Sequence, residues 1–135
     1  MLANGLFDLL HVGHLRYLQA ARRLGDLLVV ALNDDRSARR LRGPGRPLLP
    51  GRDRARLVAA VRGVDVVLLF GGGTVGEIVK RLHPDIHCKG TDYTPGTIPE
   101  RDVVRRYGGR VRVVGGPKRH ATSDLIRRIA AGRPG

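Results

Sequence analysis

Long hydrophobic runs, cysteine and aromatic residues are all scarce in this chain of 135 residues. No apolar run approaches the ~20 residues that a helix needs to cross a bilayer, which argues against a membrane protein. The first residues do not combine a basic segment with an apolar one, so we expect no signal peptide. A single cysteine, Cys88, cannot form an internal disulfide, and this scarcity is typical of a protein that works in the reducing cytoplasm.

Aromatic side chains make up 4% of the chain, and tryptophan is absent. A protein with so few rings is poorly equipped to stack the bases of a nucleic acid. The formal net charge of +13 nevertheless leaves a nucleic-acid surface as an alternative. Arginine supplies 22 of the 25 basic residues, and these are scattered along the whole chain. We therefore interpret the charge mainly as a compositional bias with some anion binding.

Apolar runs alternate with helical patterns along the chain. The runs 26–32 and 64–70 are typical of strands covered on both faces, as in parallel sheets. Shorter strand candidates are found at 1–4, 85–89 and 111–115. With 41% hydrophobic residues the chain can bury the core of one domain, which we place at 1–131 and expect to be followed by a flexible tail at 132–135.

The predicted helices carry start and stop signals. The first has apolar residues at 15, 18, 21 and 24 on one face and ends at Gly25. The second covers 54–61, and in the third Thr74 and Glu77 form a capping box. The other signals are Pro99 at the start of the fourth helix, Gly108-Gly109 after it, and Thr122 or Ser123 as the cap of the fifth, with Leu125, Ile126 and Ile129 facing inward. The alternation predicts a three-layer α/β/α fold with a parallel sheet.

Two histidines three residues apart lie in the turn between the first strand and the first helix. At a helix start His11 and His14 project from one side, and Gly13 between them lets a phosphate approach the backbone. In a doubly wound fold this turn presents helix N–H groups to an anion, and two imidazole donors there can hold charge that develops on a phosphate. The alternatives are surface or core histidines, or a metal pair, although no third metal ligand has a recognisable spacing.

The wider string around these histidines follows the pattern G-x-F-D-x-x-H-x-G-H from Gly5 to His14. It resembles the signature of the cytidylyltransferase-like nucleotidylyltransferase family. The resemblance implies a Rossmann-like, five-stranded parallel sheet in the order 3-2-1-4-5, with the motif at its topological switch point. It also implies catalytic roles for the two histidines and contacts to the nucleotide or its phosphates from Asn4, Gly5, Phe7, Asp8 and Gly13.

The loop after the fourth predicted strand reads Lys89-Gly90-Thr91-Asp92-Tyr93. It resembles the KGxDY loop of bacterial heptose-1-phosphate adenylyltransferases, and glycerol-3-phosphate cytidylyltransferases are less similar there. The resemblance implies that Lys89 meets a phosphate and that Asp92 accepts hydrogen bonds from hydroxyl groups. The residues expected to contact the acceptor are therefore Asp8, Lys89, Gly90, Asp92 and Tyr93. The alternative is an ordinary solvated loop.

Arginines follow the second predicted strand in a stretch that resembles the K-G-x-x-R-P…R pattern of the heptose enzymes. Arg46 and Arg54 match this pattern, while Arg42 replaces a lysine and keeps the charge. The resemblance implies that they clamp the triphosphate or the leaving pyrophosphate, and it adds Arg54 to the catalytic residues. The alternative is a solvated basic loop and helix face.

The last motif, His120 to Arg127, resembles the S-T-T-x-x-x-[KR] segment of the family. Thr122 and Ser123 match by hydroxyl and Arg127 by charge, whereas Ala121 lacks a hydroxyl. These three matching residues are expected at the nucleotide phosphates, although simple helix capping is an alternative that can coexist with that role. The upstream arginine of the cytidylyltransferases aligns with Gly116, and possible substitutes are Lys118, Arg119 and His120. This departure favours an adenylyltransferase.

The implied reaction joins a sugar phosphate to the nucleotidyl group of a nucleoside triphosphate, with release of pyrophosphate. We rank ATP above CTP and heptose 1-phosphate above other acceptors. A glycerol-3-phosphate or phosphoethanolamine cytidylyltransferase comes second, and a non-catalytic nucleotide- or nucleic-acid-binding module is the alternative of another class. Magnesium is expected on the triphosphate, held largely by phosphate oxygens and water, with no direct side-chain ligand and with Asp8 as an indirect ligand at most. The resemblance also implies a homodimer.

Overall fold

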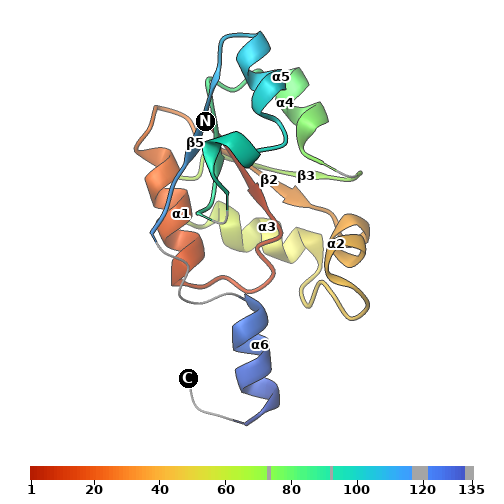
Figure 1. Ribbon diagram of the computed structural model, residues 1–135. Helices are drawn as coiled ribbons and strands as arrows, with labels where there is room; N and C mark the ends of the chain where they lie inside the picture. Colours follow the sequence, from red (N-terminus) through yellow and green to blue (C-terminus); the bar gives the residue numbers. More distant parts are fainter. Residues whose placement is uncertain (73, 92, 117–121, 133–135) are drawn as a thin grey trace.

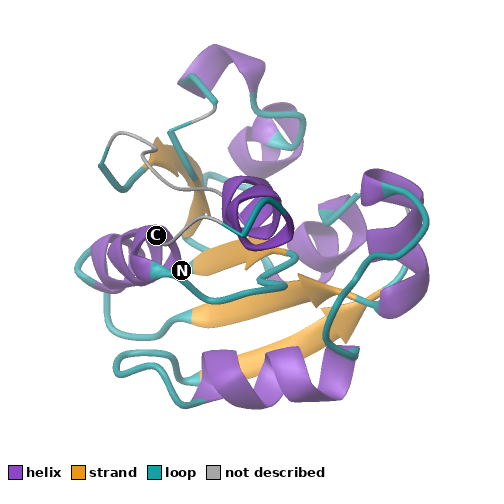
Figure 2. Ribbon diagram, turned by 90° about the horizontal axis from the view of Figure 1, so that it is seen from below, coloured by secondary structure: helices purple, strands orange, loops and turns teal. Residues whose placement is uncertain are grey.

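The computed structural model describes residues 1–72, 74–91, 93–116 and 122–132, with the backbone alone at Pro95 and Thr122. Five strands form one parallel sheet in the order β3-β2-β1-β4-β5. Helices lie on both sides of this sheet (Figures 1 and 2), so the three-layer fold and its strand order are confirmed. The strands are β1 (Leu2–Gly5), β2 (Val29–Asn33), β3 (Val66–Phe70), β4 (Ile86–Lys89) and β5 (Arg110–Val113).

Six α-helices and one short 3₁₀ helix connect or follow the strands in the described part of the chain (Figure 1). None of these described helices combines the length and the apolar character that a membrane crossing needs. The helices are α1 (Val12–Arg22), α2 (Asp35–Arg42), α3 (Gly51–Ala59), α4 (Gly76–Leu82), η1 (Pro95–Thr97), α5 (Arg101–Arg106) and α6 (Thr122–Ala130).

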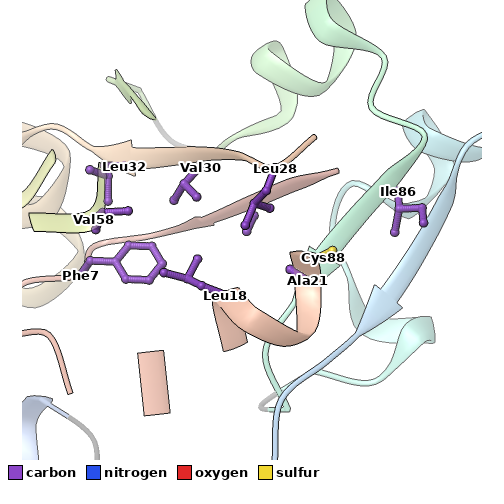
Figure 3. Close-up of a cluster of buried hydrophobic side chains, with 10 residues drawn as sticks. Phe7, Leu18, Ala21, Leu28, Val30, Leu32, Val58, Ile86 and Cys88 are labelled. Atoms are coloured by element: carbon purple, nitrogen blue, oxygen red, sulfur yellow. The ribbon is translucent and has the colours of Figure 1, made fainter. Parts of the chain in front are cut away.

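The core consists of two apolar clusters that involve different helices. One cluster joins the strands to α1 and α3, through residues such as Leu18 and Val58, and is drawn in Figure 3. The other joins them to α4 and α5, through Val79 and Val104. Strand β2 contributes Val30 and Leu32 to the first cluster and Ala31 to the second. Because alternate residues of a strand point to opposite faces, β2 is buried on both sides, as its apolar run predicts.

Strand β3 is less covered than its sequence suggests. Its apolar run predicts burial on both faces, but Val66 is 44% and Leu69 45% exposed. The reason is position, since among the described residues β3 pairs with β2 alone and forms one edge of the sheet. Composition alone does not distinguish an apolar edge strand from a central one.

Helix α2 was not among the predicted helices. It contains four arginines and few apolar residues, so it lacks the periodic apolar face by which helices are recognised. Its stabilisation is local, because the N-cap Asp34 accepts a 2.8 Å hydrogen bond from the amide of Ser37. Ser37 and Ala38 are its buried residues, and they attach the helix to the end of β2.

Several predicted helix ends are wrong. Helix α1 stops at Arg22, before Gly25, and α3 begins at Gly51 rather than at residue 54. The capping box at Thr74 and Glu77 is not formed: the amide of Gly76 donates to the Thr74 hydroxyl at 3.2 Å, and the helix begins at Gly76 after the buried Val75. Pro99 also precedes its helix, which starts at Arg101. The preceding Ile98 is extended and buried in the second cluster, which delays the helix.

Helix α6 extends away from the rest of the domain, past the carboxyl ends of the strands (Figure 1). The prediction that Leu125, Ile126 and Ile129 face inward is therefore wrong for Ile129, which is 72% exposed, while Leu125 and Ile126 are half-buried. Helix α6 has no sheet face beneath it, so amphipathic spacing does not lead to burial here. Apart from Gly132, the predicted tail lies outside the described residues.

Candidate active site

A pocket of about 500 Å³ opens at the carboxyl ends of β1 and β4. The connections from these neighbouring strands leave to opposite sides of the sheet, which is the topological switch point where α/β folds bind ligands. Residues of the sequence motifs that line it are Asn4, Gly5, Phe7, Asp8, His11, Gly13, His14, Arg42, Arg46, Lys89, Gly90, Tyr93 and Ser123. The tertiary structure thus joins four segments that are far apart in the sequence.

The two histidines of the first turn cap helix α1. His11 is the N-cap residue, and its Nδ1 accepts a 3.1 Å hydrogen bond from the amide of Gly13. A reciprocal hydrogen bond completes the cap, because His14 Nδ1 accepts from the amide of His11 at 3.3 Å. The rings stack with their centroids 3.8 Å apart. Since each Nδ1 is an acceptor, a neutral ring carries its hydrogen on Nε2, so both histidines have the donor form that binds phosphate oxygens.

The ring of Phe7 packs against the ring of His14. The backbone of Phe7 has a φ of 52°, in the left-handed region, and its side chain is 4% exposed in the core. The Phe7 ring lies 5.0 Å from that of His14, measured between centroids. Gly5 makes room for it, because a Cβ on Gly5 would lie 3.0 Å from the Phe7 Cε2 atom. Both residues line the pocket, but these contacts make them supports for His14.

Asp8 fastens the arginine-bearing loop after α2 to the pocket. Its side chain is 1% exposed and accepts hydrogen bonds from Arg46 Nε at 2.8 Å and from the amides of Leu48 at 2.9 Å and Leu49 at 3.0 Å. Burial on its own raises the pKa of this carboxyl. The two amides and Arg46 outweigh that effect and hold the pKa below its usual value. The carboxylate is thus engaged by the protein, while its expected contacts to the acceptor and, indirectly, to magnesium stay predictions.

The lowered pKa of Asp8 predicts an acid-dependent loss of stability. A carboxyl whose pKa is lower in the folded than in the unfolded state stabilises the fold above its unfolded pKa, and this is lost as the pH falls through the folded pKa. We expect Asp8→Asn to lower the free energy of unfolding near neutral pH, and the gap to wild type to shrink below about pH 4. Urea unfolding of both proteins across this range measures it. A gap that does not change with pH would contradict the pairing.

Arg54 lies elsewhere than its predicted catalytic role requires. Its side chain is fully buried and does not line the pocket. The guanidinium donates to the carbonyl oxygens of Leu6 and Asn33, each at 2.8 Å, and of Leu49 at 3.0 Å. It also pairs with Asp35 at 2.8 Å. Arg54 therefore joins the ends of β1 and β2 to the loop before α3, and its side chain is not among those that line the pocket.

Lys89 is the last residue of β4 and lines the pocket that the start of α1 also lines. It is 7% exposed, and its Nζ lies 5.1 Å from the centre of the Tyr93 ring. Gly90, Thr91 and Tyr93 line the pocket as well, and we call these three residues together with Lys89 the Lys89 wall. Asp92, the residue expected to bind acceptor hydroxyls, lies outside the described residues.

Helix α6 brings one of its predicted residues to the pocket. Ser123 lines it, whereas Arg127 does not and instead pairs with Asp124 on the same helix. Thr122 is the first residue of α6 and Ser123 the second, so neither of the two residues expected to cap the helix occupies the position before it. The side chain of Thr122 lies outside the described residues, as do Lys118, Arg119, His120 and Ala121.

Some pocket residues carry no motif that could have identified them. Arg16 and Tyr17 line the pocket from α1, and Asn33 lines it from the end of β2. Tyr17 donates a 2.7 Å hydrogen bond to the carbonyl of Cys88, which ties α1 to β4, and burial raises the pKa of its phenol. Asn4 has a buried Oδ1 that finds no hydrogen-bond partner among the described residues, so the pocket contains an acceptor that a ligand can satisfy.

Comparison with known proteins agrees with this geometry. The family model described as cytidylyltransferase-like matches residues 2–126. A solved structure, the lipopolysaccharide core biosynthesis protein from Thermoplasma volcanium GSS1, is 32% identical in sequence and superposes with a TM-score of 0.67. The match covers 84% of this chain and 91% of that one.

Curated relatives are more similar in sequence but much longer. The bifunctional protein HldE of Syntrophotalea carbinolica is 52% identical over 126 residues, which is 93% of this chain and 26% of the relative. HldE of Magnetococcus marinus is 49% identical over 128 residues, again 26% of its length. The chain thus spans about a quarter of these relatives. The pocket, the sheet order and these matches together show that the chain belongs to the cytidylyltransferase-like family of nucleotidyltransferases.

Proposed function

We propose that this chain transfers the adenylyl group of ATP to heptose 1-phosphate and releases pyrophosphate. The observation that carries the proposal is the composition of the pocket, because the His11 and His14 pair lines the same cavity as Lys89 and Tyr93. The similarity to HldE over nearly the whole chain supports a heptose phosphate as the acceptor. The sequence from Lys89 to Tyr93 supports the same acceptor, because it resembles the corresponding loop of the heptose enzymes.

The chemistry needs no nucleophilic side chain. An oxygen of the acceptor phosphate attacks the α-phosphorus of the triphosphate, a new P–O bond forms, and the bond to the β-phosphate oxygen breaks. Negative charge increases on the α-phosphate and on the departing pyrophosphate. Catalysis then consists of alignment and of stabilising that charge with donors that are already in place.

The histidine pair and helix α1 suit the α-phosphate. Capping fixes both rings, so their Nε2–H donors need no reorganisation when charge develops. The N-terminus of α1 adds the positive end of the helix dipole. Capping thus supplies the rigidity that the proposed role of the rings requires.

Two arginines are suited to the β- and γ-phosphates. Arg46 uses its Nε on Asp8, and this pair fixes the guanidinium at the pocket wall. Arg42 lines the same side and is exposed to solvent. Planar guanidinium groups bind phosphate oxygens in pairs, which suits retention of pyrophosphate until the transfer is complete.

We further propose that the nucleotide enters as its magnesium complex, with the metal held by phosphate oxygens and water. This arrangement fits Asp8, the carboxylate that lines the pocket in the described part of the chain, because it already accepts hydrogen bonds from Arg46 and two amides. The proposed assembly is a homodimer, which sedimentation can measure.

A panel of substrates tests the proposed reaction. Purified protein is incubated with each of ATP, CTP, GTP, UTP and dTTP, in the presence of heptose 1-phosphate or glycerol 3-phosphate, and pyrophosphate is measured. We expect ATP with heptose 1-phosphate to give the largest kcat/KM. Preferential use of CTP with glycerol 3-phosphate would replace the proposal by a cytidylyltransferase. Salt-dependent binding of nucleic acid without pyrophosphate release would favour a non-catalytic module.

A further inference from the structure

A buried charged cluster lies directly behind the Lys89 wall of the pocket. Glu100 is 5% exposed, and its Oε2 is 3.9 Å from Lys89 Nζ and 3.4 Å from His87 Nε2. His87 is fully buried. The three groups come from β4 and from the residue immediately before α5. None of the sequence motifs includes His87 or Glu100.

The sheet geometry explains why these groups meet. Alternate residues of β4 point to opposite faces, so Ile86 and Cys88 join the cluster with α1 while His87 and Lys89 face the α5 side. On that side, Glu100 is the N-cap residue of α5 but makes no side-chain capping hydrogen bond. Its carboxylate is directed to His87 and Lys89 instead of satisfying the helix start.

Burying these charged groups costs free energy, so the cluster requires an explanation. A buried carboxylate and a buried ammonium group each lose hydration, and a well-packed apolar pair is often at least as stable. Stability alone therefore does not account for the cluster. Lys89, however, is both a member of the cluster and part of the pocket wall, so the cluster connects to the ligand site.

Burial and an acidic neighbour act on Lys89 in opposite directions. Burial lowers the pKa of the Lys89 ammonium group, and Glu100 offsets part of this fall, so the pKa lies below its usual value. Burial raises the pKa of Glu100, but His87 and Lys89 outweigh this and hold it below its usual value. The Tyr93 ring lies against Lys89. The other charged or titratable groups that line the same pocket are Asp8, His11, His14, Arg16, Tyr17, Arg42 and Arg46.

We propose that Glu100 is a positioning residue whose carboxylate, beside His87, keeps the Lys89 ammonium group in the pocket wall so that Lys89 binds the phosphate of the acceptor. The proposal rests on the proposed function, because it assigns Lys89 to the sugar phosphate. Glu100 is not among the residues that line the pocket, so its proposed effect on the acceptor is exerted through Lys89. Without its carboxylate the buried lysine loses its proton at lower pH and moves freely, and the acceptor phosphate loses a cation.

The pairing can be tested without any substrate. The chain contains three lysines, Lys80, Lys89 and Lys118, so protein labelled with [ε-¹³C]lysine gives few signals, which Lys→Arg variants assign. We expect Glu100→Gln to lower the pKa of Lys89 by about one unit or more, as loss of an adjacent opposite charge does. Glu77→Gln is the matched control, since Glu77 is exposed on α4 and pairs with Lys80. It leaves the Lys89 titration unchanged.

Kinetics then test the consequence for the acceptor. In Glu100→Gln we expect the KM for heptose 1-phosphate to rise about tenfold at a pH between the two Lys89 pKa values that the titration measures, because there the lysine has lost its charge in the variant only. At a pH below both measured pKa values the same KM changes little, because Lys89 is charged in both proteins. The KM for ATP is unaffected at either pH. A merely structural role would raise both constants, or lower kcat, at every pH.

Two outcomes overturn the inference. One is a Lys89 pKa that does not fall in Glu100→Gln, and the other is a fall that leaves the acceptor KM unchanged. If Glu100→Gln does not fold, Glu100→Asp retains the charge at a greater distance, and a Lys89 pKa equal to that of wild type then contradicts the pairing. Absence of turnover with any substrate pair would refute the proposed function and with it the acceptor role, while the titration still reports on the pairing.

Discussion

Replacing His14 with alanine is expected to lower kcat by about a hundredfold or more, as removal of a donor to transition-state charge does. The reason is that His14 Nδ1 is used for capping, so the Nε2–H is the part of the ring that can meet the α-phosphate. The same substitution removes a helix cap and should lower the free energy of unfolding by about 1 kcal/mol. Turnover and urea unfolding of the same protein measure the two effects.

His14→Asn separates these two roles. The asparagine oxygen can take the place of Nδ1 and accept from the amide of His11, but nothing replaces the Nε2–H. We expect this variant to be close to wild type in stability and as inactive as His14→Ala. Recovery of turnover in His14→Asn would show that the ring acts only as a cap, and the proposed catalytic role would have to be abandoned.

Arg54→Met is expected to lower the free energy of unfolding by about 3 kcal/mol or more. Arg54 is fully buried and donates to the carbonyl oxygens of Leu6, Asn33 and Leu49. Methionine fills much of the space but leaves these buried acceptors without their donor. Asp35 contributes less to the loss, because its side chain is half exposed and regains hydration. The expected loss in Arg54→Met is a large share of the free energy of unfolding of an ordinary domain.

Arg56→Met is the matched control, because Arg56 is exposed on the same helix. Its free energy of unfolding should stay within about 0.5 kcal/mol of wild type. Urea unfolding distinguishes the two variants. If Arg54→Met kept full stability and lost nucleotide binding, Arg54 would be a phosphate ligand after all, and the buried network would not describe its function.

Much of the fold could be predicted from local patterns. The apolar runs located all five strands, and their alternation with helices predicted the parallel sheet. Such patterns are weaker where packing determines the outcome. Helix α2 has no apolar stripe that would identify it, because its start is stabilised by capping. The first residues of α4 and α5 depend on where the buried Val75 and Ile98 pack.

The candidate site divides in the same way. The strand-to-helix turn from Gly5 to His14 is a single contiguous segment, so its residues identify the reaction class directly. Arg54 shows the limit of this reasoning, because matching a family pattern does not reveal whether a guanidinium reaches the pocket or the protein's own carbonyl groups. Asp8 shows it as well, since its partners are about forty residues later in the chain.

The amino-acid sequence by itself determined the strands, the layered fold and the paired histidines that line the pocket, because each depends on residues close together in the chain. Only the tertiary structure decided which charges face the ligand and which face the protein. It buries Arg54, engages Asp8, and directs Glu100 to Lys89. The physical reason is that a buried charge takes its partner from whatever neighbour lies within a few ångströms, and the packing of the sheet and helices sets those neighbours.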